Sequence, residues 1–198
     1  MRKGLIAIGI IVIGGLILYS FFAGRYNTMV ELQEAIPKEW AQVETQYQRR
    51  ADLIPNLVNT VKGYAKFEQE TLTRVIEARA SATQVKVDPT NITPEALQRF
   101  QQAQNGVSSA LGRLLAVVEN YPDLKANQNF LDLQAQLEGT ENRIAVARTR
   151  FNEVVLPYNI YIKRFPTNVL ANMYGFKEKG YFESAEDSEK APTVDFGN

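Results

Sequence analysis

Cysteine and histidine are absent from the 198 residues of this chain. Without cysteine the chain has no disulfide and no thiol nucleophile, and without histidine it has no Ser-His-Asp triad and no histidine ligand for haem. The usual zinc sites and the Glu-x-x-His pairs of di-iron helical proteins are excluded for the same reason. We therefore expect no metal ion and no cofactor.

An excess of charge of either sign is also missing. Lysine and arginine together number 22, as do aspartate and glutamate, so the formal net charge is zero. A protein that neutralises a run of phosphates needs a basic surplus, so we expect no nucleic-acid partner. A chain of 198 residues has room for one domain with one core and for one or two further segments.

Sequence signals of catalysis are scarce as well. The sequence has no phosphate-binding loop of the GxxxxGKS or GxGxxG type. Glutamates such as Glu68, Glu70, Glu119 and Glu138 fall on expected helices, where the solvated faces of helical proteins ordinarily carry them. We assign no catalytic residue and expect no enzymatic activity.

A long apolar run opens the sequence. Residues 5–23 contain no charged side chain and consist mainly of isoleucine, leucine and valine. A bilayer core of about 30 Å needs roughly 20 helical residues, so residues 1–24 are predicted to form a transmembrane anchor. A cleaved signal peptide is the alternative, but it requires small residues before the cleavage position, where bulky Phe21 and Phe22 stand.

The charges around this run predict its orientation. Arg2 and Lys3 precede it, whereas acidic residues appear only after it. By the positive-inside rule, we expect a single-pass membrane protein with its N-terminus in the cytoplasm and its C-terminal domain outside. The residues expected at the membrane interface are Tyr19, Arg25, Lys163, Arg164 and Tyr174.

The remainder of the sequence is typical of helices. From residue 25 onward apolar residues recur at every third or fourth position, a coiled-coil-like spacing that predicts an all-α chain. Asp52 is a good N-cap, Pro55 is tolerated in a first turn, and the preceding Arg49 and Arg50 suit a helix C-terminus. We therefore predict a break there, with helices over residues 25–50, 53–84, 94–120 and 127–163.

Four helices of comparable length indicate an antiparallel, up-down-up-down four-helix bundle over residues 25–166. Its first helix is expected to be continuous with the transmembrane helix. Without the predicted break, Ile36, Trp40, Val43 and Tyr47 would lie exposed unless the chain formed an oligomer.

Two sets of polar residues are candidates for a functional site. The bundle would bring the turns 49–55 and 121–127 together at a tip, where charged and aromatic residues either cap helices or recognise a partner. These tip residues are Arg49, Arg50, Asp52, Asn56, Tyr121, Asp123 and Asn127. The second set is expected at similar heights in the third and fourth helices and consists of Gln104, Thr140 and Glu141. It either fixes the helix register as a buried polar layer or lines a ligand pocket.

Two segments follow the fourth helix. Residues 167–182 are predicted to form a short amphipathic helix and a strap. The apolar face of this helix consists of Val169, Leu170, Met173 and Tyr174. The helix either closes the lower end of the bundle, which we favour, or lies on lipid headgroups. Residues 183–198 are acidic and poor in core-forming residues, so we expect a disordered tail.

Several long motifs resemble the LemA family of bacterial envelope proteins. The most distinctive are RRADLIPNLV at residues 49–58 and GTENRIAVAR at residues 139–148, and the similarity extends over nearly the whole chain, including FPTNVLANMYGFKEKGYFE at residues 165–183. The resemblance implies an N-terminally anchored helical bundle of uncertain molecular function. Magnetosome-associated relatives imply a role in shaping or organising membrane.

Two functions fit these observations. The first is a self-assembling membrane scaffold or interaction module, whose partners are membrane lipid, further copies of the chain and an envelope protein. The small residues Gly9, Gly14, Gly15 and Ser20 in the apolar run favour helix association. The second is an extracytoplasmic sensor that binds a small ligand between its helices and works through a partner protein.

Overall fold

Helices make up all the regular structure in the described part of the chain. The computed structural model describes residues 2–63 and 68–183, and within these ranges it contains six helices and no strand. The helices are α1 (Arg2–Lys62), α2 (Gln69–Gln84), α3 (Pro94–Val118), α4 (Pro122–Lys125), α5 (Gln128–Lys163) and α6 (Thr167–Tyr174). The predicted all-α class is confirmed. The predicted tail over residues 183–198 lies outside the described residues except for Glu183.

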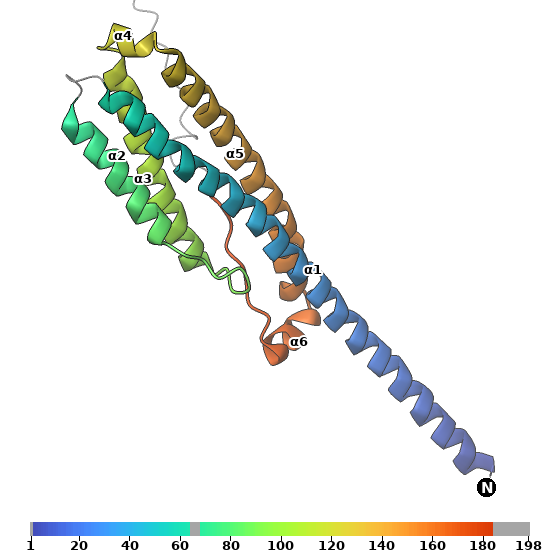
Figure 1. Cartoon of the computed structure of the whole chain (residues 1–198). Helices are drawn as coiled ribbons and strands as arrows, with labels where there is room; N and C mark the ends of the chain where they lie inside the picture. Colours follow the sequence, from blue (N-terminus) through green and yellow to red (C-terminus); the bar gives the residue numbers. More distant parts are fainter. Residues whose placement is uncertain (1, 64–67, 184–198) are drawn as a thin grey trace, which may run out of the picture.

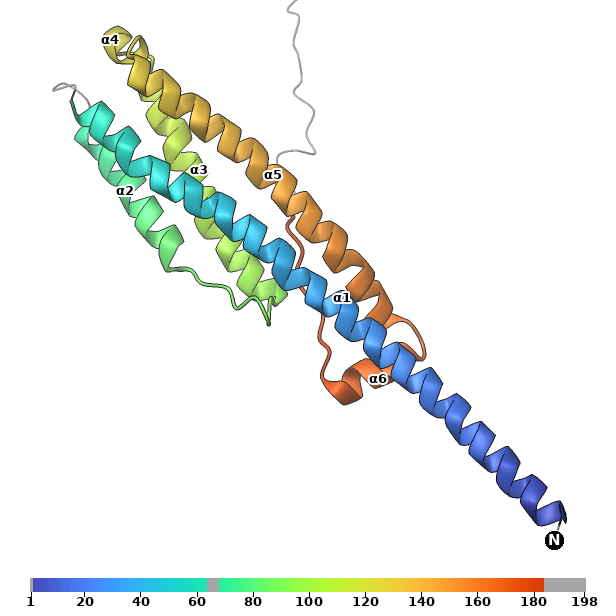
Figure 2. The ribbon, with the colours of Figure 1, turned by 45° about the vertical axis from the view of Figure 1, so that its right-hand side comes forward.

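The long helices pack mainly as two neighbouring pairs. α5 lies along α1, α3 lies along α2, and α1 also contacts α2 (Figure 1). Figure 2 shows from another side that α4 lies at the end of the molecule far from the N-terminus, whereas α6 lies beside α1 and nearer to the N-terminus. The N-terminal part of α1 projects beyond all the other helices.

α1 runs unbroken through the position of the predicted turn. It spans 61 residues and contains Pro37 and Pro55, so the prediction that one helix ends at residue 50 and the next begins at 53 is wrong. A proline inside a helix leaves the carbonyl four residues earlier without its intrahelical donor. For Pro55 this carbonyl belongs to Ala51, and the side chain of Arg79 in α2 donates to it from Nε at 2.7 Å. This long-range hydrogen bond replaces the missing intrahelical one.

The other helix starts lie close to the predicted ones. α3 begins directly after Thr93, whose Oγ1 accepts from the backbone N–H of Ala96 at 3.2 Å. α5 begins directly after Asn127, whose Oδ1 accepts from the backbone N–H of Phe130 at 3.1 Å. Such caps satisfy N–H groups that a first helical turn leaves unpaired. The expectation of comparable helix lengths is wrong, because α2 has only 16 residues.

The middle of α1 finds its apolar partners within the chain. The residues expected to be exposed on an unbroken first helix are all buried, namely Ile36, Trp40, Val43 and Tyr47. The Trp40 ring packs edge-on against Phe151 of α5 with centroids 5.6 Å apart, and it stacks on Phe182 at 6.1 Å. α5 and the C-terminal segment therefore supply the partner that we expected only from an oligomer.

After α6 the chain passes along α5 as a strap without regular secondary structure, residues 176–183. Asparagine side chains of α5 hold its backbone. Asn159 accepts from the N–H of Lys179 at 3.0 Å and donates to the carbonyl of the same residue at 2.8 Å. Asn152 pairs in the same way with Phe182, with both hydrogen bonds at 2.9 Å. These side chains satisfy buried backbone groups for which the strap has no ladder partner.

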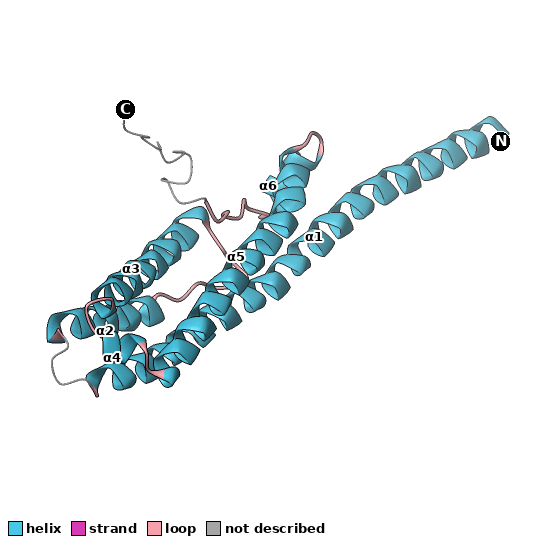
Figure 3. Ribbon diagram, turned by 90° about the horizontal axis from the view of Figure 1, so that it is seen from above, coloured by secondary structure: helices cyan, strands magenta, loops and turns pink. Residues whose placement is uncertain are grey.

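The projecting part of α1 is long and apolar enough to cross a membrane, as judged by length and composition. Every large apolar side chain described between Leu5 and Tyr19 is more than half exposed. Figure 3 shows that this part is helical as far as it is described and continuous with the packed part of α1. The predicted continuity between the apolar helix and the first core helix is confirmed, and the helix supports membrane association of the chain.

Candidate functional site

A buried arginine joins three helices. Arg50 of α1 is only 2% exposed. Its Nη1 donates to Glu141 Oε1 of α5 and to Ser108 Oγ of α3, both at 2.8 Å. Its Nη2 donates to the side-chain oxygen of Gln104 at 2.5 Å and to the carbonyl of the same residue at 3.1 Å. A carboxylate and three other oxygens thus compensate for the removal of this charge from water.

Within the residues that the structure describes, this polar layer lies between two clusters of buried apolar side chains. On the side toward the membrane helix, the cluster includes Tyr47, Phe100 and Ile144. On the other side, the second cluster includes Ile54, Val107 and Leu137. Arg50 in α1, Gln104 in α3 and Glu141 in α5 lie between these positions in their respective helices. Sliding one helix past another would break these hydrogen bonds, so the layer links the register of α1, α3 and α5.

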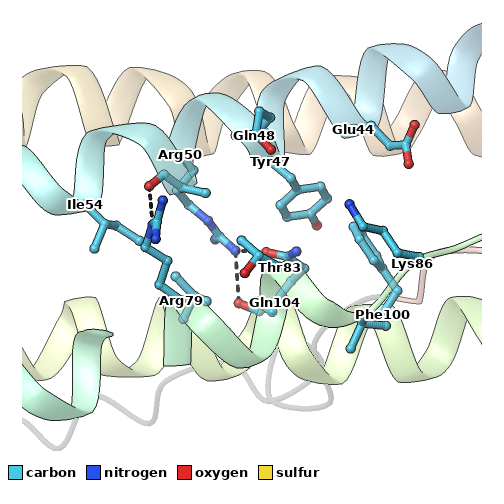
Figure 4. A pocket seen from close by; sticks show the side chains of 14 residues that line it. Glu44, Tyr47, Gln48, Arg50, Ile54, Arg79, Thr83, Lys86, Phe100 and Gln104 are labelled. Atoms are coloured by element: carbon cyan, nitrogen blue, oxygen red, sulfur yellow. Dashed lines mark hydrogen bonds between the residues drawn. The ribbon is translucent and has the colours of Figure 1, made fainter. Parts of the chain in front are cut away.

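A hollow opens beside Arg50 between α1, α3 and the C-terminal end of α2 (Figure 4). It measures about 610 Å³, a volume that includes space open to solvent. Its charged lining comes from Arg50, Arg79, Lys86 and Glu44, so basic groups outnumber acidic ones. Cations and amides that converge on an open hollow are suited to bind a small anion.

Tyr47 and Phe100 form an aromatic wall of the hollow. Their ring centroids lie 5.1 Å apart in an edge-to-face arrangement, and the Arg50 guanidinium lies 5.1 Å from the centroid of the Tyr47 ring. Burial raises the pKa of the Tyr47 hydroxyl, although the charges of Arg148 and Arg50 act in the opposite direction. The phenol is therefore neutral at physiological pH.

Acidic groups are not gathered into a metal centre in the part of the chain that the structure describes. Within residues 2–63 and 68–183, no three or more Asp or Glu side chains lie close enough together to hold a metal ion. The Arg50 layer contains one carboxylate, Glu141, and this carboxylate already accepts from a guanidinium.

The structure separates the predicted tip residues into two groups. Four of them lie within α1, namely Arg49, Arg50, Asp52 and Asn56. Three lie in or beside α4, namely Tyr121, Asp123 and Asn127. The predicted convergence from two turns is wrong for the first group, because α1 continues to Lys62. A recognition role for the exposed members stays a prediction.

The structure brings together two of the three residues predicted for the polar layer. Gln104 and Glu141 both contact Arg50. Thr140 instead donates to the carbonyl of Gln136 at 2.7 Å and accepts from Arg143 at 3.1 Å. Arg50 was not predicted in the polar layer, because the predicted turn at residues 49–55 placed this arginine at the tip.

Most of the residues predicted at the membrane interface lie at the base of the packed region, which is the end where the projecting part of α1 leaves the other helices. Those at the base are Arg25, Lys163, Arg164 and Tyr174. Arg25 donates from Nη1 to Thr167 Oγ1 at 3.0 Å, and Lys163 pairs with Glu178 at 2.6 Å. Tyr19 lies in the projecting part of α1 and is 72% exposed. Contact of these residues with lipid stays a prediction.

Sequence reasoning missed Arg79 and the two strap-binding asparagines, Asn152 and Asn159. Each forms a hydrogen bond with the backbone of a distant residue, at a sequence separation of 28 for Arg79, 30 for Asn152 and 20 for Asn159. Polar residues on helices usually face water, so the spacing of these three does not reveal a buried partner. The one usable signal is the proline at position 55, whose presence in a helix would require an outside donor.

Comparisons with known proteins place the chain among bacterial relatives. Residues 39–196 match the family model described as the LemA family. The chain is 31% identical over 176 residues to magnetosome protein MamQ 2 of Paramagnetospirillum magneticum, and equally so to MamQ 1 of that organism. Each match covers 80% of this chain but only 65% of the relative, which is slightly less than two thirds of its length. Protein LemA of Metamycoplasma hominis is 25% identical over 170 residues, covering 86% of this chain and 74% of the relative.

Proposed function

The chain belongs to the LemA family, and from this premise we propose that it is a non-enzymatic, membrane-anchored scaffold that assembles with further copies of itself and thereby organises the membrane around it. In this proposal residues 1–24 cross the inner membrane once, with the N-terminus in the cytoplasm. Residues 25–166 form an antiparallel four-helix bundle outside the cytoplasm, residues 167–182 form the helix and strap below it, and residues 183–198 form the tail.

The observation that carries the proposal is the continuity of α1. One helix of 61 residues holds both the exposed apolar stretch and the buried face that packs on α5. The carbonyl that Pro55 frees is bonded by Arg79, so this proline does not leave an unsatisfied group at which the helix would open. A rod of this kind transmits the tilt and rotation of the membrane helix to the whole domain.

Self-assembly is supported by two open surfaces. A side chain added at Gly9, Gly14 or Gly15 would meet no other atom within 4 Å, so a second helix can approach α1 closely there. On α5, the apolar residues Leu156 and Ile160 are 51% and 41% exposed and lie one helical turn apart. Copies of the chain that paired through these surfaces would share one membrane plane.

Native mass spectrometry of the full chain in nanodiscs tests the assembly. We expect oligomers whose population rises with protein concentration. Gly14→Leu and Gly15→Leu should reduce them, whereas Val12→Leu, which changes an already bulky exposed position, should not. A species that stays monomeric at every concentration would contradict the scaffold.

A ligand-binding sensor is the second candidate, and the hollow beside Arg50 favours it. Arg79 and Lys86 line this hollow together with Arg50, so the ligand would be a small anion. Thermal-shift measurements with phosphate and with short dicarboxylates test this candidate, because a ligand that binds the folded state raises Tm. The rise should be lost in Lys86→Ala and kept in Lys62→Ala, which changes a residue outside the hollow. No shift with any of these anions would favour the scaffold.

A further inference from the structure

α6 has two apolar faces. The face turned toward the core contains Leu170 and Ala171, which are 5% and 2% exposed. The opposite face contains Val169 and Met173, which are 59% and 65% exposed. Phe165, in the turn before the helix, adds a further exposed apolar side chain next to α6 and is 82% exposed. Val169 and Met173 are four residues apart within α6, so they lie on the same side of this helix.

The outer face lies at the level where the apolar run of α1 ends. Tyr26 of α1 packs edge-on against Tyr174 with ring centroids 4.9 Å apart and against Phe176 at 5.8 Å. One residue earlier, Arg25 is the first charged residue after the apolar run, and it donates to Thr167 at the start of α6. α6 is therefore attached to α1 within one turn of the end of the apolar run.

The charges around α6 are mainly basic. Arg164 precedes the helix and Lys177 follows it, and both are exposed. Lys163 is paired with Glu178, which is the one acidic residue between positions 163 and 180. An apolar face with flanking cations at the surface of a bilayer is the arrangement of interfacial helices, and the cations attract anionic headgroups.

We propose that residues 164–177 form a second membrane contact, in which Phe165, Val169 and Met173 enter the boundary between headgroups and acyl chains while Arg164 and Lys177 contact anionic phosphates. This inference rests on the proposed anchoring of α1 and adds that the chain meets the bilayer at two places. One helix through a membrane can rotate about its axis and tilt. A second contact beside it fixes both, so every copy presents the same side of its domain to its neighbours.

Fluorescent reporters on single cysteines test the contact in the full chain, which has no native cysteine. The protein is placed in vesicles of phosphatidylcholine with about one quarter phosphatidylglycerol, a composition that supplies anionic headgroups. An environment-sensitive dye is attached at Val169→Cys or Met173→Cys, and quenching by nitroxide-labelled lipid is measured. Val146→Cys is the matched control, because Val146 is also an exposed valine, at 52%, but lies near the middle of α5.

A third position separates this inference from the proposed anchoring. Ile11→Cys carries the dye in the apolar run and reports whether α1 is in the membrane at all. We expect blue-shifted emission and lipid quenching at positions 11, 169 and 173, and neither at 146. Quenching at 11 but not at 169 and 173 would overturn the second contact and leave the anchor standing. No quenching at 11 would contradict the proposed function itself.

The same reporters test whether the contact depends on anionic lipid and whether a second copy of the chain covers α6 instead. Vesicles of phosphatidylcholine alone, or the double change Arg164→Ala and Lys177→Ala, should reduce quenching at 169 and leave quenching at 11 unchanged. A dye at 169 that is blue-shifted, escapes lipid quenching and returns to longer wavelength on dilution would show that a second copy covers α6. That result would overturn the lipid contact.

Discussion

Arg79 of α2 donates from Nε to the backbone carbonyl of Ala51 in α1 at 2.7 Å, the carbonyl that Pro55 leaves without an intrahelical donor. This contact predicts a specific dependence between two substitutions. Arg79→Met keeps the apolar stem but removes the donor, and it should destabilise the chain by about 1–2 kcal/mol. In a Pro55→Ala background the new N–H bonds Ala51 within the helix, so the same change should cost clearly less.

Chemical denaturation of the four proteins of this cycle in detergent micelles measures the difference. Arg74→Met is the control, because Arg74 is half exposed on the same helix and pairs with Glu70 one turn away. Its effect should stay within about 0.5 kcal/mol. Equal costs of Arg79→Met with and without Pro55 would show that the hydrogen bond does not compensate for the proline.

The same contact explains why the sequence predicted the wrong turn. Asp52 followed by Pro55 is typical of a helix start, and local propensities were the only information that the sequence offered there. The donor that keeps the helix intact comes from residue 79, and no local rule contains it. Where the signals were local, as with the cap at Thr93 or the helical character of the apolar run over residues 5–23, the prediction agreed with the structure.

The pair of Arg50 and Glu141 gives the second prediction. Glu141→Ala leaves a guanidinium that is 2% exposed without this carboxylate, and it should cost about 2–3 kcal/mol. Glu141→Gln keeps a hydrogen-bond acceptor and should cost about half as much. Glu138→Ala, an exposed change one turn earlier on α5, should stay within about 0.5 kcal/mol. The midpoints of chemical denaturation, compared among variants whose unfolding free energy has the same dependence on denaturant concentration, test this order of stability losses. Equal effects of the three changes would contradict a structural role for the pair.

The strap gives the third prediction. Asn159→Ala removes both hydrogen bonds to Lys179 and leaves a buried N–H and a buried carbonyl unpaired, at a cost of about 2–4 kcal/mol. Gln101→Ala removes the same kind of pairing with Glu183 at an exposed position, and it should cost less than about 1 kcal/mol. Hydrogen exchange followed by mass spectrometry should show faster exchange at residues 176–183 in the first variant. Unchanged protection would mean that apolar contacts alone hold the strap.

The region around the strap also shows which structural features could be predicted from the sequence and which could not. The short helix after residue 166 was predicted from the helical spacing of its apolar residues, and a role as a lid on the bundle was favoured for it. Burial of Phe182 beside Trp40 was not predicted, because the two residues lie 142 positions apart and no periodic pattern links them. An irregular segment has no repeat from which its buried side can be read.

Alanine substitutions at two glycines are expected to change the stability of the chain in opposite directions. A Cβ at Gly180 of the strap would lie 2.9 Å from Cα of Pro94 and 3.1 Å from Cβ of Leu97, so Gly180→Ala should destabilise by about 1–3 kcal/mol. A Cβ at Gly106 inside α3 would meet nothing within 4 Å, so Gly106→Ala should stabilise by about 0.5–1 kcal/mol through helix propensity. Thermal melting of both variants compares them directly. A Tm for Gly180→Ala at or above that of the parent chain would show that α3 does not pack closely on the strap.

Tyr158 gives a prediction for alkaline pH. Its side chain is fully buried, its hydroxyl donates to the carbonyl of Lys177 at 2.9 Å, and burial raises its pKa from 10.0 to about 12. Between pH 10 and 12 the unfolded chain loses this proton while the folded chain keeps it, so the free energy of unfolding should fall by about 1–2 kcal/mol.

Tyr158→Phe isolates this contribution from those of other groups. Burial also raises the pKa of Tyr47, which adds to the fall, and burial lowers the pKa of Lys179, which opposes it below pH 10.5. Both effects are present in the variant and in the parent chain, so they cancel in the comparison. The variant should lose about 1 kcal/mol at neutral pH through the missing hydrogen bond and should then decline less steeply above pH 10. Urea titrations at pH 8 and 11 measure the free energy of unfolding of the variant and of the parent chain. An equal fall in both proteins would mean that Tyr158 ionises at the same pH in the folded and unfolded chains. It would also mean that the contact with Lys177 opens before the domain unfolds.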